Sequence, residues 1–327
     1  MKNNTKTKDI NSKDNLYEVI TIGAGPAGLT SALYLARAGA KQIIIEKYIP
    51  GGKLTKTAFI ENYSGFEKIN GTDLAFKMYN QILKYKVVFK FETVINIIKL
   101  KSKIFKIITN KNTYFSKAVI IATGTKEREV GAINENTFYN KGVSYCAVCD
   151  GSIYKNRPVA VVGGGMSAVE ESMYLTRFVK EVHLIHRRDI FRVPPNILAK
   201  ARENKKIKWY LFHIWKEARG DDVLKEIVIL DLKKNQEKIL KVDAIFPYIG
   251  SDPIIPFQTN FPILGANNYL KNNQYCETAE PGIFAAGDVT KTPLRQVATA
   301  VSDGAKAAQF AMSYIDNLQI KDNNNDL

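Results

Sequence analysis

Residues 17–46 read YEVITIGAGPAGLTSALYLARAGAKQIIIE, and this stretch decides the fold. A short β-branched run ends in a glycine-rich turn at 23–28, and apolar residues then recur at helical spacing over 29–38. Gly39 follows as a natural helix terminator, and 42–46 is a second apolar strand. Strand, helix and strand in this order predict a βαβ unit, the smallest piece of a parallel sheet.

The same pattern restarts at Gly163. A strand over 158–162 leads into GGGMSA at 163–168, which is followed by a helix over 169–178 and a strand over 181–185. In such a turn the first glycine permits the bend, the second lets the backbone approach a pyrophosphate, and the third position allows close packing of helix on strand. The helix N-terminus adds partial positive charge beside the phosphates. Two turns in this context predict two dinucleotide sites, against the alternative of purely structural turns.

The residues that end each second strand distinguish the two nucleotides. Glu46 ends the first one, and a carboxylate there accepts hydrogen bonds from ribose hydroxyls and repels a 2′-phosphate. At the same place in the second copy stands HRRDIFR, which carries Arg187, Arg188 and Arg192. Guanidinium groups make charge-assisted bidentate bonds to phosphate. The first site is therefore expected to hold FAD or NAD and the second NADPH, unless the arginines are only a solvated charge run.

The rest of the chain alternates strands and helices. We expect helices over 72–84 and 295–317 and strands over 87–98, 104–109, 113–121, 207–212, 223–232, 239–246 and 282–286. The simplest architecture is α/β, with two Rossmann-like nucleotide-binding domains, the second inserted into the first. The expected division is a polar tail at 1–16, a first nucleotide domain at 17–126 and 249–319, an inserted domain with the second nucleotide site at 127–248, and a polar tail at 320–327.

Composition excludes several classes of protein. Of the 327 residues, 45% are apolar and 24% are charged, which is an ordinary globular balance. The net charge of +15 is dispersed and accompanies no RNA-binding or helix-turn-helix signature, so we expect no nucleic-acid partner. No segment approaches the ~20 apolar residues of a membrane span, and the polar N-terminus lacks the apolar core of a signal peptide. A soluble, cytoplasmic protein without a membrane partner is expected.

The sequence CAVCDG at 146–151 carries the sharpest chemical signal. The spacing of Cys146 and Cys149 brings two sulfurs close enough to close a small disulfide, and a nearby helix N-terminus would lower a thiol pKa. Asp150 could move a proton during electron transfer if burial raises its pKa. A closed zinc site is the main rival, but it needs four ligands and only Cys276 and three histidines remain, so we expect no metal. An inert buried pair is the other alternative.

With these residues in view, the chain resembles the bacterial-type, low-molecular-weight thioredoxin reductases. The resemblance covers about residues 17–318 and rests on the motifs GAGPAG, GGKLT, ATG, CAVCDG, GGGMSAVEE, HRRDIFR, GIFAAGDV and RQVA. It implies a homodimeric flavoprotein that moves electrons from NADPH to FAD, then to a Cys146–Cys149 disulfide and on to oxidised thioredoxin. With the domain layout, it also implies that the inserted domain rotates on its two linkers between the half-reactions.

The resemblance assigns roles to individual positions. Cys149 matches the thiol that faces the flavin, Cys146 the thiol that attacks thioredoxin, and Asp150 the acid–base group. The positions expected to contact FAD are Gly23, Gly25, Pro26, Ala27, Gly28, Glu46, Lys47, Gly51, Gly52, Lys53, Leu54, Asn62, Ala122, Thr123, Gly124, Gly287, Asp288, Arg295, Gln296 and Val297. The positions expected to contact NADPH are Gly163, Gly165, Met166, Ser167, Ala168, His186, Arg187, Arg188 and Arg192.

The chain departs from the family pattern at three places. Lys53 replaces the usual Gln, Met166 replaces the usual Asn, and Pro194-Pro195 interrupts what is normally a helix. None of the three touches the cysteines. Flavoproteins of the same fold that reduce ferredoxin or a quinone lack the CxxC, and partners of a peroxidase carry a much longer N-terminal extension, so both alternatives fit this sequence less well.

Overall fold

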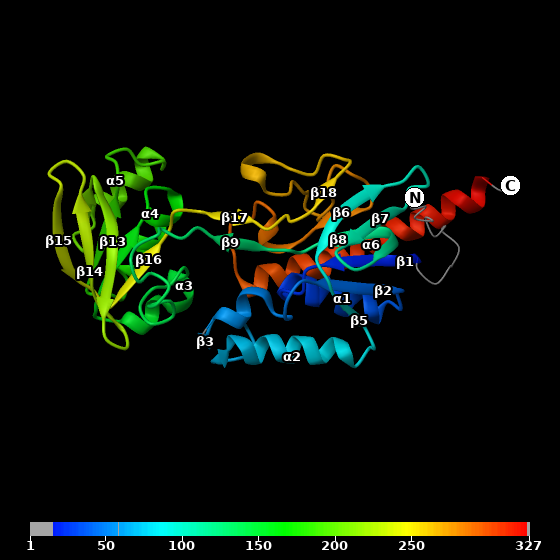
Figure 1. Cartoon of the computed structure of the whole chain (residues 1–327), viewed down its shortest axis with the longest axis horizontal. Coiled ribbons are helices and arrows are strands. Elements are labelled where there is room, and N and C mark those ends of the chain that lie inside the picture. Colours follow the sequence, from blue (N-terminus) through cyan, green and yellow to red (C-terminus); the bar gives the residue numbers. More distant parts are fainter. Residues whose placement is uncertain (1–15, 58, 326–327) are drawn as a thin grey trace, which may run out of the picture. The chain divides into compact units, whose positions relative to one another are not determined.

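The computed structural model describes residues 16–57 and 59–325, so most of the expected N-terminal tail and residues 326–327 lie outside the described residues. The chain divides into two compact units (Figure 1). Among the described residues, unit 1 holds 16–56, 70–125 and 253–325, and unit 2 holds 57, 59–69 and 126–252. The placement of 57–69 in unit 2 differs from the division that the sequence predicts.

Unit 1 is built on an eight-stranded sheet with the order β18-β6-β7-β8-β1-β2-β5, in which β19 also pairs with β8. Strands β8, β1, β2 and β5 run parallel, as do β19 on β8 and β18 on β6, whereas β6, β7 and β8 form an antiparallel meander. The strands are β1 (Leu16–Ile22), β2 (Gln42–Glu46), β5 (Val88–Phe91), β6 (Val94–Lys99), β7 (Phe105–Thr109), β8 (Thr113–Ile121), β18 (Gln258–Thr259) and β19 (Ile283–Ala285).

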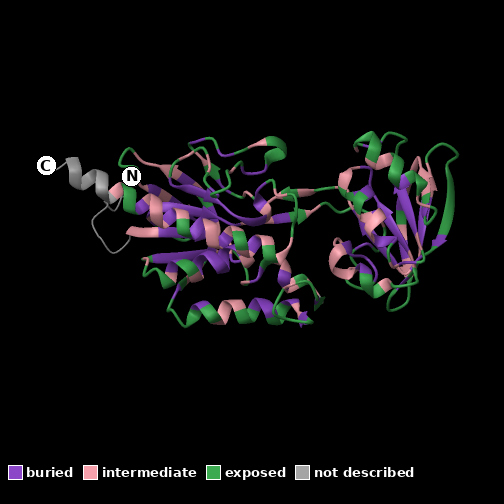
Figure 2. Cartoon of the chain, turned by 180° about the vertical axis from the view of Figure 1, so that it is seen from behind, coloured by how far each residue is buried: buried purple, intermediate pink, exposed green. Residues whose placement is uncertain are grey.

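The two faces of this sheet are covered by different material, because successive side chains of a strand point to opposite sides. Helices α1 (Pro26–Arg37) and α6 (Val297–Asn325) pack together and bury Val19 and Ile120 on one face. Helix α2 (Gly71–Leu83) extends this layer. On the other face Ile20 and Ile121 join the side chains of the meander in a second apolar core. The central strands of the sheet are accordingly coloured as buried in Figure 2.

Unit 2 holds the second βαβ pattern. A parallel sheet with the order β12-β11-β10-β16 is formed by β10 (Pro158–Val162), β11 (Glu181–His186), β12 (Ile207–Leu211) and β16 (Ala244–Pro247). Helices α4 (Met166–Leu175) and α5 (Pro195–Glu203) cover one face. An antiparallel sheet of β13 (His213–Gly220), β14 (Leu224–Asp231) and β15 (Gln236–Lys241) covers the other. Unit 2 also contains the one-turn helix α3 (Ala147–Asp150) and the 3-10 helix η3 (Gly151–Tyr154).

The division places four crossings of the chain between the units, at 56–57, 69–70, 125–126 and 252–253, and the last two lie in a pair of strands. Strands β9 (Thr125–Glu127) and β17 (Ser251–Pro253) pair with each other as a two-stranded sheet. Within unit 2 the Arg128 guanidinium donates to the Asp252 carboxylate, and the Arg128 N–H donates to the Gly250 carbonyl at 3.0 Å. The remaining short strands are β3 (Phe59–Ile60) and β4 (Ile69–Asn70), which also pair.

Several elements differ from the expected ones. The run 87–98 is broken into β5 and β6 at Glu92-Thr93, because the Glu92 carboxylate is buried and accepts hydrogen bonds from Thr109, Asn112 and Tyr114. Pro194 and Pro195 stand at the start of helix α5, which begins at Pro195, since proline is well suited to the first helical position. Strand β13 was not expected, and α6 continues to Asn325, past the expected end at residue 317. None of the helices in 16–57 and 59–325 is both long enough and apolar enough to cross a membrane.

Candidate functional site

The two cysteines of the CxxC are joined in a disulfide. Cys146 occupies the N-cap of α3, and its sulfur accepts a hydrogen bond from the Cys149 N–H at 3.1 Å. Both residues are half-buried, so they are neither sealed in the core nor fully exposed. A disulfide between residues three apart on one helical turn, close to solvent, has the geometry of a bond that can open and re-form.

The position of this turn is fixed by contacts with the parallel sheet of unit 2. The Ala147 N–H donates to the Tyr248 hydroxyl at 2.7 Å, and the Ser144 N–H donates to the Ile245 carbonyl at 3.1 Å. A Cβ built on Gly151 would lie 2.7 Å from the Leu175 side chain, so η3 packs tightly against the end of α4. The disulfide is therefore held on a rigid support, as a site that must present reacting atoms requires.

Asp150 follows Cys149 directly and is mostly buried. Burial raises the pKa of its carboxyl, and a hydrogen bond from Ser144 opposes this by lowering it. The Ser144 Oγ–Asp150 Oδ2 distance is 2.5 Å. A carboxyl with a raised pKa beside a disulfide can hold or release a proton when the bond opens.

The first glycine turn connects β1 to α1. Gly23 has a φ of +98°, and a Cβ on Gly28 would lie 1.9 Å from the Gly23 carbonyl oxygen, so only glycine fits the third position. No side chain caps α1 at Gly25, which leaves its first N–H groups available to an anion. At the end of β2 the Glu46 carboxylate accepts hydrogen bonds from the N–H of Ala24 at 2.7 Å and of Tyr48 at 2.9 Å.

A second loop approaches the same turn within unit 1. The Gly51 N–H donates to the Ala24 carbonyl at 2.7 Å, and a Cβ on Gly52 would lie 3.1 Å from the Gly25 Cα. The 3-10 helix η2 (Gly52–Lys56) follows, and its Lys53 ammonium donates to Thr125 Oγ1 at 2.7 Å and pairs with Asp288 Oδ2 at 3.3 Å. Lys53, which replaces the usual Gln, thus lies at the carboxyl edge of the sheet.

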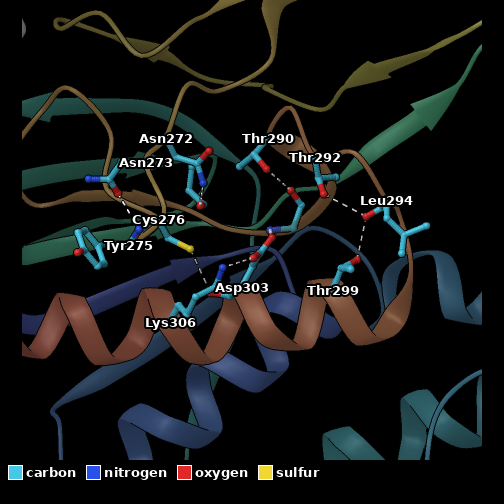
Figure 3. A network of polar contacts seen from close by, with 12 residues as sticks. Asn272, Asn273, Tyr275, Cys276, Thr290, Thr292, Leu294, Thr299, Asp303 and Lys306 are labelled. Carbon is cyan, nitrogen blue, oxygen red and sulfur yellow. Dashed lines mark hydrogen bonds and ion pairs between the residues drawn. The ribbon is translucent and has the colours of Figure 1, made fainter. Parts of the chain in front are cut away.

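The third contribution to this edge comes from the C-terminal part of the chain (Figure 3). The 3-10 helix η5 (Gly287–Val289) follows β19, and its Gly287 N–H donates to the Asp303 carboxylate of α6 at 3.3 Å. Thr299 Oγ1 accepts from the Gln296 N–H at 3.1 Å and donates to the Leu294 carbonyl at 2.9 Å, which fixes the loop before α6. Cys276 is buried in this unit, and burial raises its pKa to about 11, which disfavours the thiolate that exchange requires.

The edge of unit 1 fits a flavin dinucleotide. The N-terminus of α1 has no side-chain cap, and Gly25 and Gly52 lie close together without side chains to fill the space beside them. The Glu46 carboxylate at the end of β2 and hydrogen-bond donors at Lys53 and on the loops complete this edge. In addition, the Thr123 Oγ1 at the end of β8 is buried without a hydrogen-bond partner among the described residues. A buried hydroxyl without a partner is costly and points to an absent ligand group.

The second glycine turn connects β10 to α4 in unit 2. Gly163 has a φ of +151°, no side chain caps α4 at Gly165, and a Cβ on Gly165 would meet nothing within 4 Å. A Cβ on Gly164 would lie 2.1 Å from the His186 ring, and the Arg192 N–H donates to the Gly164 carbonyl at 2.8 Å. The arginine motif is thus attached to the glycine turn.

The charged groups around this turn suit a phosphorylated nucleotide. Arg187, Arg188 and Arg192 are exposed at the end of β11, and Gly165 leaves open space above the helix N-terminus. The His186 Nε2–H donates to the Ile190 carbonyl at 3.0 Å, and burial and then the three arginines lower the pKa of its imidazole. Its neutral ring is therefore part of the support, while the guanidinium groups are free to meet an anion.

The predicted site residues fall into two groups. Unit 1 contains Gly23, Gly25, Pro26, Ala27, Gly28, Glu46, Lys47, Gly51, Gly52, Lys53, Leu54, Ala122, Thr123, Gly124, Gly287, Asp288, Arg295, Gln296 and Val297. Unit 2 contains Cys146, Cys149, Asp150, Gly163, Gly165, Met166, Ser167, Ala168, His186, Arg187, Arg188 and Arg192. Asn62 was expected with the first group but lies in the segment 57–69 of unit 2, where it is exposed.

Comparison with known proteins decides the family. Residues 17–304 match the family model described as pyridine nucleotide-disulphide oxidoreductase. A thioredoxin reductase of Ureaplasma parvum is 42% identical over 301 residues, which are 92% of this chain and 97% of the relative. The chain belongs to the thioredoxin reductase family. This confirms the resemblance seen in the motifs and the expected α/β fold with two Rossmann-like domains.

Solved thioredoxin reductases agree with this assignment. The crystal structure of the enzyme from Streptococcus pyogenes superposes with a TM-score of 0.87 at 38% identity and covers 93% of this chain and 99% of that one. The enzyme from Lactococcus lactis, described as the FR conformation, is also 38% identical over 92% of this chain and 99% of that one, with a TM-score of 0.64.

Several residues of the site were not found from the sequence. Ser144 and Tyr248 hold the redox turn, and Thr125 and Asp303 hold the edge of unit 1. They belong to no glycine or cysteine motif. Only Ser144 lay within reach of sequence reasoning, because a serine hydroxyl often accepts the backbone N–H two residues further along the chain, here that of Cys146.

Proposed function

We propose that the protein is an NADPH-dependent flavoprotein that reduces thioredoxin. Electrons pass from NADPH through FAD to the Cys146–Cys149 disulfide and then to the disulfide of thioredoxin. The single observation that carries the proposal is the closed Cys146–Cys149 disulfide on α3, with Asp150 next to it in the sequence. The same chain holds two glycine turns, one followed by an acidic residue and the other by three arginines. The family membership supports the same order of carriers.

The residues of unit 1 would hold FAD and those of unit 2 NADPH. The uncapped N-terminus of α1 would receive the pyrophosphate, Glu46 the ribose hydroxyls, and Lys53, Thr123 and Asp288 the remaining polar groups. Arg187, Arg188 and Arg192 would bind the 2′-phosphate that distinguishes NADPH from NADH. When bound, the flavin supplies a carrier that accepts a hydride from NADPH and passes two electrons to a disulfide.

The reduced cysteines then complete the reaction by thiol–disulfide exchange. The Cys146 thiolate attacks one sulfur of thioredoxin, and the other thioredoxin sulfur leaves as a thiolate. The Cys149 thiolate attacks the Cys146 sulfur, which re-forms the Cys146–Cys149 bond and releases the second thioredoxin thiolate. Asp150 holds the proton that these thiolates gain or lose, which its buried position allows.

Unit 2 would rotate on the paired strands β9 and β17 between the two half-reactions. The support for this is that the NADPH residues and the disulfide share one unit, whereas the expected flavin residues other than Asn62 lie in the other. Of the four crossings between the units, those in β9 and β17 are paired and form a short linker that can bend without breaking either core. We also propose that the protein acts as a cytoplasmic homodimer, as the resemblance implies.

The purified protein provides the test. We expect flavin absorbance, and an anaerobic NADPH titration that takes up two electrons more than the flavin alone, because the disulfide is a second redox centre. Cys146→Ser should lose thioredoxin reduction and the extra electrons but keep the flavin. Cys276→Ser is the matched control and should behave as the wild type, since that thiol is buried in the core of unit 1. A protein without flavin, or a Cys146→Ser protein that still reduces thioredoxin, would overturn the proposal.

A further inference from the structure

A buried serine connects the first cysteine to the acid. Ser144 is 5% exposed and lies just before the redox turn. Its hydroxyl oxygen accepts the Cys146 N–H at 3.1 Å and donates its proton to Asp150 Oδ2 at 2.5 Å. Its own N–H is held by the Ile245 carbonyl of β16 at 3.1 Å, so the hydroxyl is fixed from both the sheet and the helix. A hydroxyl has one proton to donate, and in this arrangement Asp150 receives it.

We propose that Ser144 is a positioning residue that sets the orientation of Asp150 and the oxygen on which Asp150 carries its proton. Because Oδ2 already accepts the Ser144 hydroxyl, a proton taken up by the carboxyl goes to Oδ1. Oδ1 is then the oxygen that exchanges the proton with the sulfurs. This inference rests on the proposed function, in which Asp150 is the acid–base group.

The other groups around Asp150 make the serine the decisive contact. Tyr139 from the preceding loop, Tyr154 from η3 and Tyr248 from the end of the parallel sheet interact electrostatically with the carboxyl, and burial raises the pKa of each phenol. Glu171 of α4 interacts electrostatically with Tyr248. All three phenols are neutral at ordinary pH and do not compensate the carboxylate charge. Ser144 donates the hydrogen bond that favours the ionised form, against the effect of burial.

The test uses the holoenzyme and a reaction that needs neither NADPH nor thioredoxin. A small dithiol, dithiothreitol, reduces Cys146–Cys149, and the leaving thiolate takes a proton from Asp150. The rate, corrected for the thiolate fraction of the dithiol, is measured from pH 5 to 9 by trapping the freed thiols with a maleimide. Above the pKa of Asp150 the rate falls. Ser144→Ala should move this fall to higher pH, and it should lower the rate on the plateau about tenfold, the effect expected for losing a hydrogen bond to a charged group.

Matched variants separate this role from a structural one. Ser144→Thr keeps the hydroxyl and should restore the wild-type profile. Ser172→Ala removes another buried hydroxyl, which donates to the Ala168 carbonyl of its own helix, and should leave the profile unchanged. In an Asp150→Asn background, Ser144→Ala should produce no further change, because the group that it acts on is absent.

Two results would overturn the inference. One is a Ser144→Ala profile that superimposes on that of the wild type; the other is an equal shift in the Asp150→Asn background. If Ser144→Ala does not give the wild-type circular dichroism spectrum, Ser144→Gly serves the same test. If the flavin does not take up electrons from NADPH, the proposed function is contradicted. The role of Ser144 would still be tested, because the dithiothreitol assay requires neither NADPH nor electron transfer through the flavin.

Discussion

The two glycine turns share one backbone and differ in what supports it. In both, the first glycine has a positive φ and donates its N–H to the neighbouring strand, Gly23 to Ile45 and Gly163 to Ile185. Both turns open a helix that no side chain caps. Around the first turn, however, the Glu46 carboxylate accepts a backbone N–H of the turn itself, whereas the second turn rests on the uncharged ring of His186.

The difference teaches where nucleotide specificity is decided. In the proposed function, the turn would provide a site for a pyrophosphate in either unit, and the residues after the following strand would provide the charge that selects the nucleotide. At the first turn the Glu46 carboxylate is held in place by hydrogen bonds from two backbone N–H groups. At the second turn the side chains of the three arginines are exposed. A glycine turn in this context predicts a dinucleotide site, and the residues that end the following strand indicate which dinucleotide it binds.

The largest expected effect tests the shared backbone. Gly28→Ala places a methyl group 1.9 Å from the Gly23 carbonyl oxygen, so the turn must open. We expect a loss of stability of about 1–3 kcal/mol or more and loss of the flavin on gel filtration. The second turn carries Ala168 at the same place, and Ala168→Gly should cost only about 0.5–1 kcal/mol. Urea unfolding and the flavin content measure both; flavin retained by Gly28→Ala would contradict the close packing of the turn.

The next effect tests the charge of the second turn. Arg187→Ala combined with Arg188→Ala should raise KM for NADPH about ten- to a hundredfold, because charge-assisted bonds to a phosphate are lost. KM for NADH should change little, since NADH lacks the 2′-phosphate. Arg202→Ala removes an equally exposed guanidinium from α5 of the same unit and should change neither value. Equal losses for NADPH and NADH would show that the arginines do not read the phosphate.

A smaller effect tests the carboxylate of the first turn. Glu46→Gln keeps the size and removes the charge, which should weaken its bonds to two N–H groups by about 1 kcal/mol and lower flavin affinity about fivefold. Glu18→Gln is the matched control, because its carboxylate accepts the Lys41 N–H at 2.9 Å near the opposite end of the same strand pair. The two variants should differ in flavin affinity, as measured by titration of the apoprotein.

The smallest effect is a pH dependence confined to the second turn. The pKa of His186 is lowered in the folded protein by burial and by the arginines. Below about pH 6.5 the unfolded chain therefore binds a proton that the folded one does not, and stability falls as pH drops toward the folded pKa. His186→Gln should reduce this loss between pH 7 and pH 5 in urea unfolding. An identical slope for wild type and variant would mean that His186 does not titrate differently on folding.

Much of the fold could be predicted because its signals are local. The glycine turns, the βαβ order and strands β10, β11 and β19 follow from residue type and spacing alone. The break at Glu92 could not, since that carboxylate is buried only because Thr109 and Tyr114 arrive from β7 and β8. Strand β13 is stabilised by pairing with β14 along its whole length. A short window of sequence around β13 carries no information about this pairing.

The site shows the same division. Cys146, Cys149 and Asp150 are adjacent in sequence, so their disulfide and acid could be expected from the motif. The Lys53 pair with Asp288 joins residues far apart in the chain, and the Tyr248 bond to Ala147 depends on how β16 lies beside the redox turn. Such contacts arise from topology, and the sequence marks them with no motif.

The insertion of one unit into the other has a consequence for biosynthesis. Strand β19 joins the sheet of unit 1 through β8, and α6 covers α1, yet both are made roughly 160 residues after β8 ends. At the pace of a ribosome this is a delay on the order of ten seconds, during which all of the inserted residues 126–252 emerge. Until α6 is released, the edge of β8 that pairs with β19 and the face of α1 that α6 covers are exposed in the nascent chain. This period is therefore the one in which unit 1 is most prone to aggregate.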